Sequence, residues 1–247
     1  MYKVGIDIGS SAAKVVVLKD ELIVKKFVVP TGFSSRDTAD NIYLTLEAEG
    51  IDKDTAEYAA TGYGRISVPY ANKVVTEITC HGKGASYIFN DDGVVIDIGG
   101  QDTKGIVLKN SRIMKFVMND KCSAGTGKFL EIMTNRLGLT TSELSELARN
   151  GKAVTISSMC TVFAESEVIS LIGKGTPRED IAYGVIDSVV NKVVQLISQL
   201  QGERYFLTGG LCEDEYIIER LSIALEKSVI SNKDARYAGA IGAALLL

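Results

Sequence analysis

Two segments of the chain, ninety positions apart, repeat one pattern of residues, and this repeat constrains the fold more than any other feature. Residues 4–19 and 94–109 are identical at nine of sixteen aligned positions: Val4/Val94, Ile6/Ile96, Asp7/Asp97, Ile8/Ile98, Gly9/Gly99, Lys14/Lys104, Val17/Val107, Leu18/Leu108 and Lys19/Lys109. This many identities indicates two halves of related design. Each copy is an apolar run, a D-x-G turn with small residues and a second apolar run, which predicts a β-hairpin with a tight turn.

The two predicted turns have the chemistry of a phosphate site. Backbone N–H groups in a glycine-containing turn can surround phosphate oxygens without interference from side chains. The aspartate that precedes each turn, Asp7 or Asp97, can hold Mg²⁺ through its water shell. One such turn alone would more often belong to an ordinary hairpin, but two at matched register favour nucleotide binding. A weaker signal is the apolar run 205–208, which leads into Gly209-Gly210, where a planar base could approach the backbone.

Composition and motif spacing exclude several other classes of protein. The net charge of −4 over 247 residues, with no basic cluster, argues against nucleic-acid binding. No apolar run approaches the length of about 20 residues that spans a bilayer, and the start of the sequence predicts a strand rather than a signal peptide. We therefore expect a cytoplasmic protein that does not enter membranes. The segment 123–129 is not a P-loop, because Phe129 follows Lys128 where Ser or Thr is required.

Four widely spaced cysteines, Cys80, Cys122, Cys160 and Cys212, raise the question of a metal site. No C-x-x-C is present, which excludes a zinc ribbon or a thioredoxin site, and disulfides are unfavoured in the cytoplasm. Cys122 and Cys160 each precede a segment with helical spacing, and a helix N-terminus favours thiolate and binds anions. A 4Fe–4S cluster needs four thiolates, which two such cysteines from each protomer of a C2 dimer would supply. The residues alone leave two alternatives open: inert thiols, or one cluster held by all four cysteines of one chain.

Several motifs resemble, in order and along the whole chain, those of the activator ATPases of 2-hydroxyacyl-CoA dehydratases, a group that includes ATPase subunits of benzoyl-CoA reductase. They are residues 7–11, 61–65, 80–81, 97–102, 119–122, 124–127 and 160–168. The resemblance implies an α/β protein with the actin-like ATPase fold shared by acetate and sugar kinases, heat-shock chaperones and actin. Its two ribonuclease-H-like halves would surround a nucleotide. We expect the first half at residues 1–88 plus 235–247 and the second at 89–234.

The resemblance also implies an activity, cofactors and partners. Family members are homodimers with one 4Fe–4S cluster at the interface, held here by Cys122 and Cys160 of each subunit. ATP with Mg²⁺ would drive one electron from a ferredoxin or flavodoxin through this cluster to a 2-hydroxyacyl-CoA dehydratase. A double-cubane cluster protein is an alternative electron acceptor. Two other interpretations are an iron-free small-molecule kinase of the same fold and a non-redox ATP-dependent clamp.

Matching the family motifs residue by residue gives a candidate nucleotide site. Its phosphate-binding residues would be Gly9, Ser10, Ser11, Ala12, Ala13, Lys14, Gly99 and Gly100. Asp7 and Asp97 would lie near magnesium, Gln101 would orient the attacking water, and Asp102 and Glu165 are candidate bases. The adenosine would lie at Gly209, Gly210, Glu213 and Arg236, although the family pattern leads us to expect neutral amides at the last two positions.

The spacing of apolar residues predicts several regular elements around these motifs. Residues 38–49 are expected to form a helix with Ile42, Leu44 and Leu46 partly inward, and residues 57–61 a short strand. Residues 139–148 and 178–200 have helical periodicity. The last helix, from residue 235, is expected to pack on the first half of the chain.

Overall fold

The computed structural model describes residues 1–157 and 160–247, and its contacts divide the chain into two compact units. Unit 1 comprises Met1–Asp92, Leu108–Lys115 and Asn232–Leu247, and unit 2 comprises Gly93–Val107 and Phe116–Ser231. The domain boundaries expected from the sequence stay a prediction. No helix in the described part of the chain is both long and apolar enough to cross a membrane.

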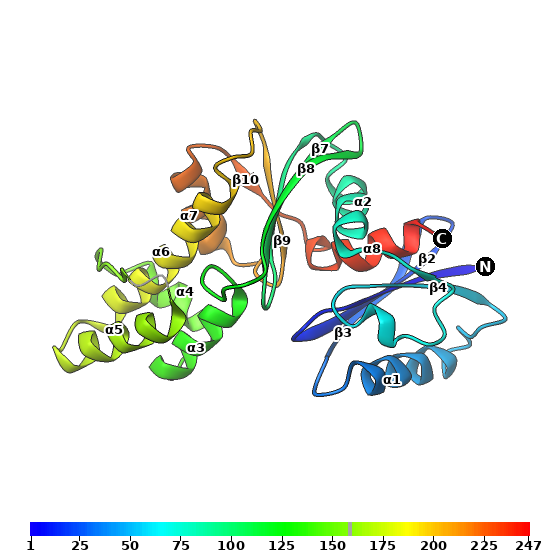
Figure 1. Ribbon diagram of the computed structural model, residues 1–247, viewed down its shortest axis with the longest axis horizontal. Coiled ribbons are helices and arrows are strands. Elements are labelled where there is room, and N and C mark those ends of the chain that lie inside the picture. Colours follow the sequence, from blue (N-terminus) through cyan, green and yellow to red (C-terminus); the bar gives the residue numbers. More distant parts are fainter. Residues whose placement is uncertain (158–159) are drawn as a thin grey trace. The chain divides into compact units, whose positions relative to one another are not determined.

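Unit 1 is built on a five-stranded sheet of order β3-β2-β1-β4-β5 (Figure 1). Strand β1 pairs antiparallel with β2 and parallel with β4. Helix α8 packs on α2 and against β1, β2 and β4, so the C-terminal helix returns to the first half of the chain as expected. The elements are β1 (Tyr2–Ile8), β2 (Ala12–Lys19), β3 (Leu22–Pro30), α1 (Ser35–Glu47), β4 (Ala56–Thr61), η1 (Arg65–Ser67), β5 (Lys73–Val74), α2 (Glu77–Phe89), η2 (Ala235–Tyr237) and α8 (Ala238–Leu245).

The second sheet has the order β10-β9-β6-β7-β8, and α3 to α7 belong to unit 2 (Figure 1). Strands β6 and β9 pair parallel, as do β9 and β10. The elements are β6 (Gly93–Ile98), β7 (Thr103–Lys109), β8 (Arg112–Asn119), α3 (Gly127–Leu137), α4 (Thr141–Ala148), α5 (Thr161–Gly173), α6 (Arg178–Ile197), β9 (Tyr205–Gly209), α7 (Glu215–Leu225) and β10 (Val229–Ile230).

The strand orders confirm the internal repeat. When the five strands of each half are numbered along the chain, both sheets have the order 3-2-1-4-5. The repeat extends to the second turn of each half. Asp20 and Glu21 join β2 to β3, and Asn110 and Ser111 join β7 to β8, with positive φ at all four residues. Paired left-handed residues are typical of a tight type I′ hairpin.

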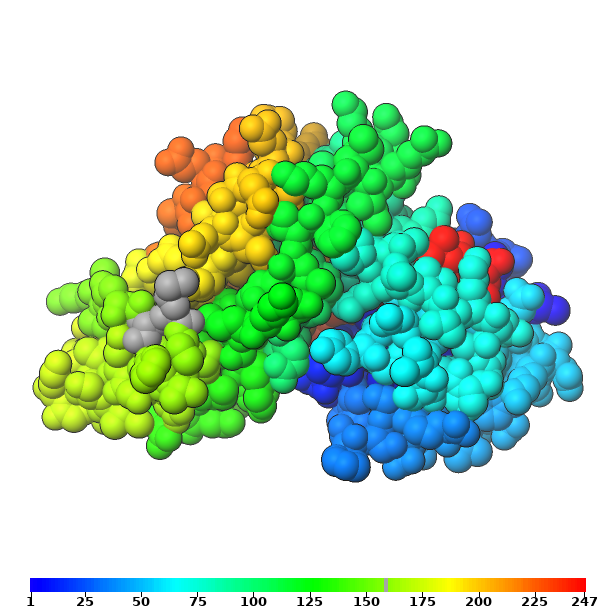
Figure 2. Space-filling model, in the orientation of Figure 1, coloured from blue at the N-terminus to red at the C-terminus, as the bar shows by residue number. Residues whose placement is uncertain are grey.

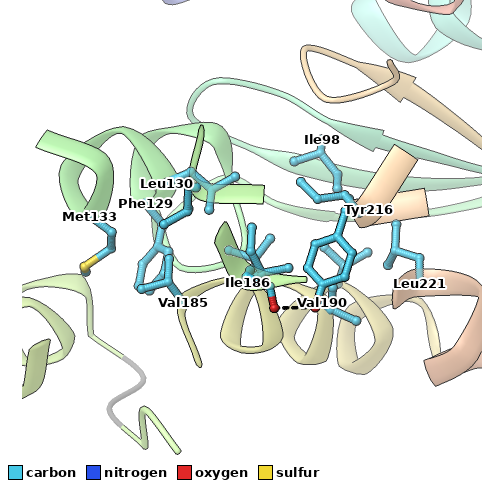
Figure 3. Packing of buried hydrophobic residues seen from close by; sticks show 14 of the residues in the cluster. Ile98, Phe129, Leu130, Met133, Val185, Ile186, Val190, Tyr216 and Leu221 are labelled. Carbon is cyan, nitrogen blue, oxygen red and sulfur yellow. Dashed lines mark hydrogen bonds between the residues drawn. The ribbon is translucent and has the colours of Figure 1, made fainter. Parts of the chain in front are cut away.

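The core of unit 2 is formed by helices that pack on each other and on the sheet. Phe129, Leu130 and Met133 of α3 lie beside Val185 and Ile186 of α6, and all five are buried (Figure 3). Burying such side chains contributes about 1.5–3 kcal/mol each. Ala164 and Val168 of α5 belong to the same core, so this packing fixes both helices that follow the candidate cluster cysteines, α3 and α5.

The predicted elements are present with shifted ends. Helix α1 begins at Ser35, earlier than expected, because the Ser34 hydroxyl caps it by accepting a hydrogen bond from the Asp37 N–H. Ile42 and Leu46 of α1 are buried as expected, but Leu44 is 59% exposed, so its inward placement was wrong. Residues two positions apart on a helix point to different faces.

Small residues let α2 and α8 approach so closely that their backbones touch. A Cβ at Gly242 would lie 1.7 Å from the Cys80 carbonyl oxygen, and one at Gly84 would lie 1.8 Å from the Ala238 oxygen. We expect Gly242→Ala to lower the free energy of unfolding by about 1–3 kcal/mol, because the helices must separate. Urea denaturation would measure this. In the control Gly173→Ala, at the last residue of α5, the new Cβ meets nothing within 4 Å, so its stability should equal that of wild type or exceed it by up to about 1 kcal/mol. Equal stability of both variants would contradict the close contact.

Candidate functional site

The first glycine turn lies at the end of β1 in unit 1. The Gly9 N–H donates to the Ala12 carbonyl at 3.2 Å, which closes the turn, and Ser10 and Ser11 are exposed at its tip. Thr31 holds the turn from behind: its hydroxyl donates to the Gly9 carbonyl at 2.8 Å, and its N–H donates to the Ser11 carbonyl at 3.1 Å. The turn therefore presents its backbone and small side chains outward.

Asp7 lies one position before the end of β1, and its carboxylate is surrounded by glycines. Cβ atoms at Gly62 and Gly239 would lie 2.3 Å and 2.6 Å from its two carboxylate oxygens, and Gly62 has a φ of +83° that favours glycine. Asp7 is 8% exposed and pairs in register with Lys14 and with Thr61. The sequence reasoning assigned no role to Gly62, Gly239 or Thr31.

The second turn repeats this arrangement within unit 2. The Gly99 N–H donates to the Asp102 carbonyl at 2.9 Å, and the side chain of Gln101 is exposed. A Cβ at Gly209, which has a φ of +86°, would lie 2.6 Å from an Asp97 carboxylate oxygen. Asp97 pairs in register with Thr208, as Asp7 does with Thr61. A Thr-Gly pair at the end of the neighbouring parallel strand therefore lies beside the aspartate in both units. Its repetition at 61–62 and 208–209 was a visible signal that we missed.

Lys104 distinguishes the second turn from the first. It is 1% exposed, and its ammonium lies 2.8 Å from the Asp102 carboxylate and 3.3 Å from the Asp97 carboxylate. A buried lysine is tolerated when such partners compensate its charge. The first turn has Ala12 in place of Asp102, and Lys14 is half-buried. The two copies thus share a backbone design but differ in charge arrangement.

The candidate hydrolytic residues fall in two places. Gln101 and Asp102 lie together in the second turn. Glu165 lies on α5, where its carboxylate accepts a hydrogen bond from the Arg136 Nε of α3 at 3.0 Å. The candidate bases therefore lie on two separate elements of unit 2.

A cavity of about 500 Å³ lies beside Gly210 in unit 2. Gly210 and Glu213 line it, whereas Arg236 belongs to unit 1. On its walls the Ser145 hydroxyl donates to the Asp214 carboxylate at 2.5 Å, and the Arg149 guanidinium lies 5.0 Å from the centre of the Tyr216 ring. The α4 residues lie more than sixty positions before Gly210 in the sequence, and no sequence motif marked them. The full lining is Thr141, Ser142, Ser145, Glu146, Arg149, Gly210, Leu211, Glu213, Asp214, Glu215 and Tyr216.

The four thiols differ sharply in exposure. Cys122 and Cys160 are exposed, whereas Cys80 and Cys212 are 0% and 1% exposed. Cys160 is the N-cap residue of α5, which confirms its expected position near the start of a helix. Cys122 lies in the loop before α3, whose N-cap residue is Thr126. The candidate ligand pair is therefore the accessible pair.

This difference predicts selective alkylation of the metal-free protein. Burial raises the pKa of the Cys80 thiol to about 11, so only about a thousandth of it is thiolate at pH 8. Iodoacetamide at pH 8 should therefore modify Cys122 and Cys160 at least about tenfold faster than Cys80 and Cys212. Peptide mass spectrometry measures the four rates, and a denatured sample, in which all four should react, is the control. Equal rates in the folded protein would contradict the assigned burial.

The two repeated sheets with their strand-end turns define a protein of the actin-like fold. A solved ROK family glucokinase from Streptomyces griseus, in complex with glucose and AMPPNP, shares this fold with a TM-score of 0.61 at 16% identity, covering 100% of this chain and 99% of that chain. The sequence profile of the BadF/BadG/BcrA/BcrD ATPase family matches residues 4–246, and the chain belongs to that family.

Two dehydratase activators are among its most similar relatives. The (R)-2-hydroxyglutaryl-CoA dehydratase activating ATPase of Acidaminococcus fermentans is 44% identical over 250 residues, covering 99% of this chain and 96% of the relative. The crystal structure of component A of that organism's dehydratase has a TM-score of 0.93, covering 100% of this chain and 97% of that chain, at 42% identity. The activator of the 2-hydroxyisocaproyl-CoA dehydratase from Clostridium difficile, solved with bound ADPNP, has a TM-score of 0.92 and 36% identity, covering 100% and 94%.

Proposed function

We propose that this ATPase activates a 2-hydroxyacyl-CoA dehydratase by delivering one electron to it in an ATP-dependent step. The observation that carries the proposal is the pair of exposed thiols, Cys122 and Cys160, on neighbouring segments of a chain whose relatives are dehydratase-activating ATPases. An iron-free kinase of the same fold would have no use for such a pair.

The donor set fits half of a 4Fe–4S site. Thiolates are the usual ligands of such clusters, which require four. No group of three or more His, Cys, Asp and Glu that could hold a metal exists among the described residues of one chain. Cys122 and Cys160 would therefore bind the cluster together with the same two cysteines of a second copy, in a homodimer with C2 symmetry. When bound, the cluster supplies one-electron redox chemistry.

The nucleotide role rests on the two turns. Each unit supplies one glycine turn whose tip N–H groups can donate to phosphate oxygens, at Ser10 and Ser11 in one and at Gly100 and Gln101 in the other. Asp7 and Asp97 would bind Mg²⁺ through its water shell. The cavity beside Gly210 would hold the adenosine, with the carboxylate of Glu213 at its edge.

A direct structural link joins the second turn to the cysteine loop. The Gly127 and Lys128 N–H groups, the first two of α3, donate to the Gly99 and Gly100 carbonyls at 2.9 Å and 2.8 Å. A displacement of this turn by a phosphate group would therefore act on the start of α3, five residues after Cys122. This link supports a coupling of nucleotide state to the thiols.

The proposed electron donor is a ferredoxin or flavodoxin, and the proposed acceptor is the dehydratase. Both follow from the family resemblance, and the acceptor also from the names of the relatives. Exposure of Cys122 and Cys160 at the surface of unit 2 suits an exchange of electrons with separate proteins.

The test is the iron and acid-labile sulfide content of protein purified without oxygen, with the molar mass from light scattering. We expect about two of each per chain in a dimer, since four are shared by two chains. An absence of iron after anaerobic reconstitution would reject the electron-transfer function and leave only the ATPase.

A further inference from the structure

A hydrogen bond between two hydroxyl groups joins the segments that carry the exposed cysteines. Ser123 directly follows Cys122, and Thr161 directly follows Cys160. The Ser123 Oγ and Thr161 Oγ1 atoms lie 2.7 Å apart, although the residues are 38 positions apart in the sequence. Thr161 is 7% exposed, so this bond is largely protected from water. It therefore holds the immediate neighbours of the two thiols together.

The Cys122 loop is also held from its own side. The Asn119 side chain accepts from the Cys122 N–H at 3.3 Å and donates to the Cys122 and Ala124 carbonyls at 2.8 Å and 3.2 Å. The Thr126 hydroxyl donates to the Ser123 carbonyl at 2.7 Å. The backbone of Ser123 is thus attached to α3, while its side chain reaches α5. This makes Ser123 the junction between the two cysteine-bearing segments.

A second connection lies further along the same helices. Helices α3 and α5 pack against each other, and Arg136 of α3 pairs with Glu165 of α5. Figure 2 shows the yellow-green atoms of α5 at the surface of unit 2, where the helix lacks cover on its outer side. On its inner side α5 is held by the buried Ala164 and Val168 and, near the thiols, by the Thr161 hydroxyl.

We propose that Ser123 and Thr161 are positioning residues that hold Cys122 and Cys160 of one chain at a fixed separation, so that each chain presents a preformed thiol pair to a metal cluster. That the thiol pair binds a metal cluster rests on the proposed function, whereas the fixed separation of the two thiols does not. Hydrogen bonds that orient metal ligands typically change metal affinity 10–100-fold when removed. The ion pair of Glu165 with Arg136 joins α5 to α3 in the same arrangement.

The first experiment measures how fast the Cys122 and Cys160 thiols of one metal-free full chain are cross-linked to each other. Dibromobimane bridges two nearby thiols: each thiolate displaces one bromide, and two thioether bonds form. We expect Cys122–Cys160 bridging within one chain, found by peptide mass spectrometry. Its rate should fall at least about threefold in Thr161→Val and Ser123→Ala and be retained in Thr161→Ser, which keeps the hydroxyl. Monobromobimane, which needs one thiol only, should react equally with all of these variants.

The matched control is Ser166→Ala, which removes a hydroxyl of α5 that, among the described residues, donates to the Val162 carbonyl of its own helix. It should bridge like wild type. Circular dichroism identifies a variant that fails to fold. If either Thr161→Val or Ser123→Ala does so, the bridging rate of the other variant tests the proposal. Unchanged bridging in a folded Thr161→Val or Ser123→Ala, or an absence of bridging in wild type, would overturn the proposal.

The second experiment uses the iron-loaded protein without ATP or partner. Iron release to a chelator under anaerobic conditions should be about 10–100-fold faster in Thr161→Val than in wild type or Ser166→Ala. Equal iron release rates in Thr161→Val and wild type would overturn the proposal that Thr161 helps to hold the cluster. If wild-type protein binds no iron, the proposed function fails, whereas the bridging experiment still decides whether the thiol pair is preformed.

Discussion

Replacement of Cys122 or Cys160 by serine is expected to lower the iron content from about two atoms per chain to nearly none, while the protein stays folded and binds ATP. A serine hydroxyl is a poor substitute for a thiolate, and the loss of one residue removes two of the four ligands of a site shared by two chains. Both residues are exposed and outside the hydrophobic core, so the fold should tolerate the change. Iron assays with an ATP-binding titration measure the two properties separately.

The matched controls are Cys80→Ser and Cys212→Ser, which should retain iron. Both side chains are buried, so these variants are expected to lose stability rather than metal, by about 1–3 kcal/mol for an added buried hydroxyl. Loss of iron from a folded Cys80 or Cys212 variant would favour a cluster held by four cysteines of one chain. Retained iron in both Cys122→Ser and Cys160→Ser would remove the proposed ligands.

The repeat allowed the architecture to be predicted because each hairpin is a local structure. The nine identities between the two halves required two equivalent hairpins, and both sheets indeed have the same strand order. The exposure of Leu44 was missed because its environment depends on which side of α1 faces the sheet. A helical stripe defines that side only through residues three and four apart, such as Ile42 and Leu46.

The candidate site was predictable where it lies within one turn and not where it is assembled from distant segments. Gly9 and Gly99 could be assigned to turns because each directly follows its strand. The close approach of Gly62 and Gly239 to Asp7 depends on the parallel pairing of β1 with β4 and on the return of the C-terminal helix. Sequence spacing contains no information about such a distance, so these glycines had no assigned role.

We propose that the difference in charge arrangement between the two turns reflects different tasks. In the second, Lys104 is fixed between Asp97 and Asp102 by burial and by two ion pairs. A lysine held by two carboxylates keeps their oxygens in place, which suits a turn that must orient water precisely relative to a phosphate. In the first, Lys14 is only half-buried, which suits a side chain that contacts the phosphate itself. Hydrolysis is thus expected to depend mainly on the second turn.

Gln101→Ala is accordingly expected to reduce the rate of ATP hydrolysis about 100-fold with little change in ATP binding. The Gln101 side chain is exposed next to Gly100, so its carboxamide can accept from and donate to a water at the phosphate without being needed for the fold. Its backbone, which lies in the turn, is unchanged by the substitution. Steady-state phosphate release measures hydrolysis, and binding of ADPNP measures affinity.

The matched control is Gln201→Ala, an exposed glutamine before β9 that lies in neither turn, and it should hydrolyse ATP like wild type. Asp102→Asn and Glu165→Gln then separate the two candidate bases. Because Asp102 lies in the turn and Glu165 is bonded to Arg136, hydrolysis should fall in the first variant and persist in the second. Full hydrolysis in Gln101→Ala, or its loss in Glu165→Gln alone, would move the catalytic water away from the second turn and toward α5.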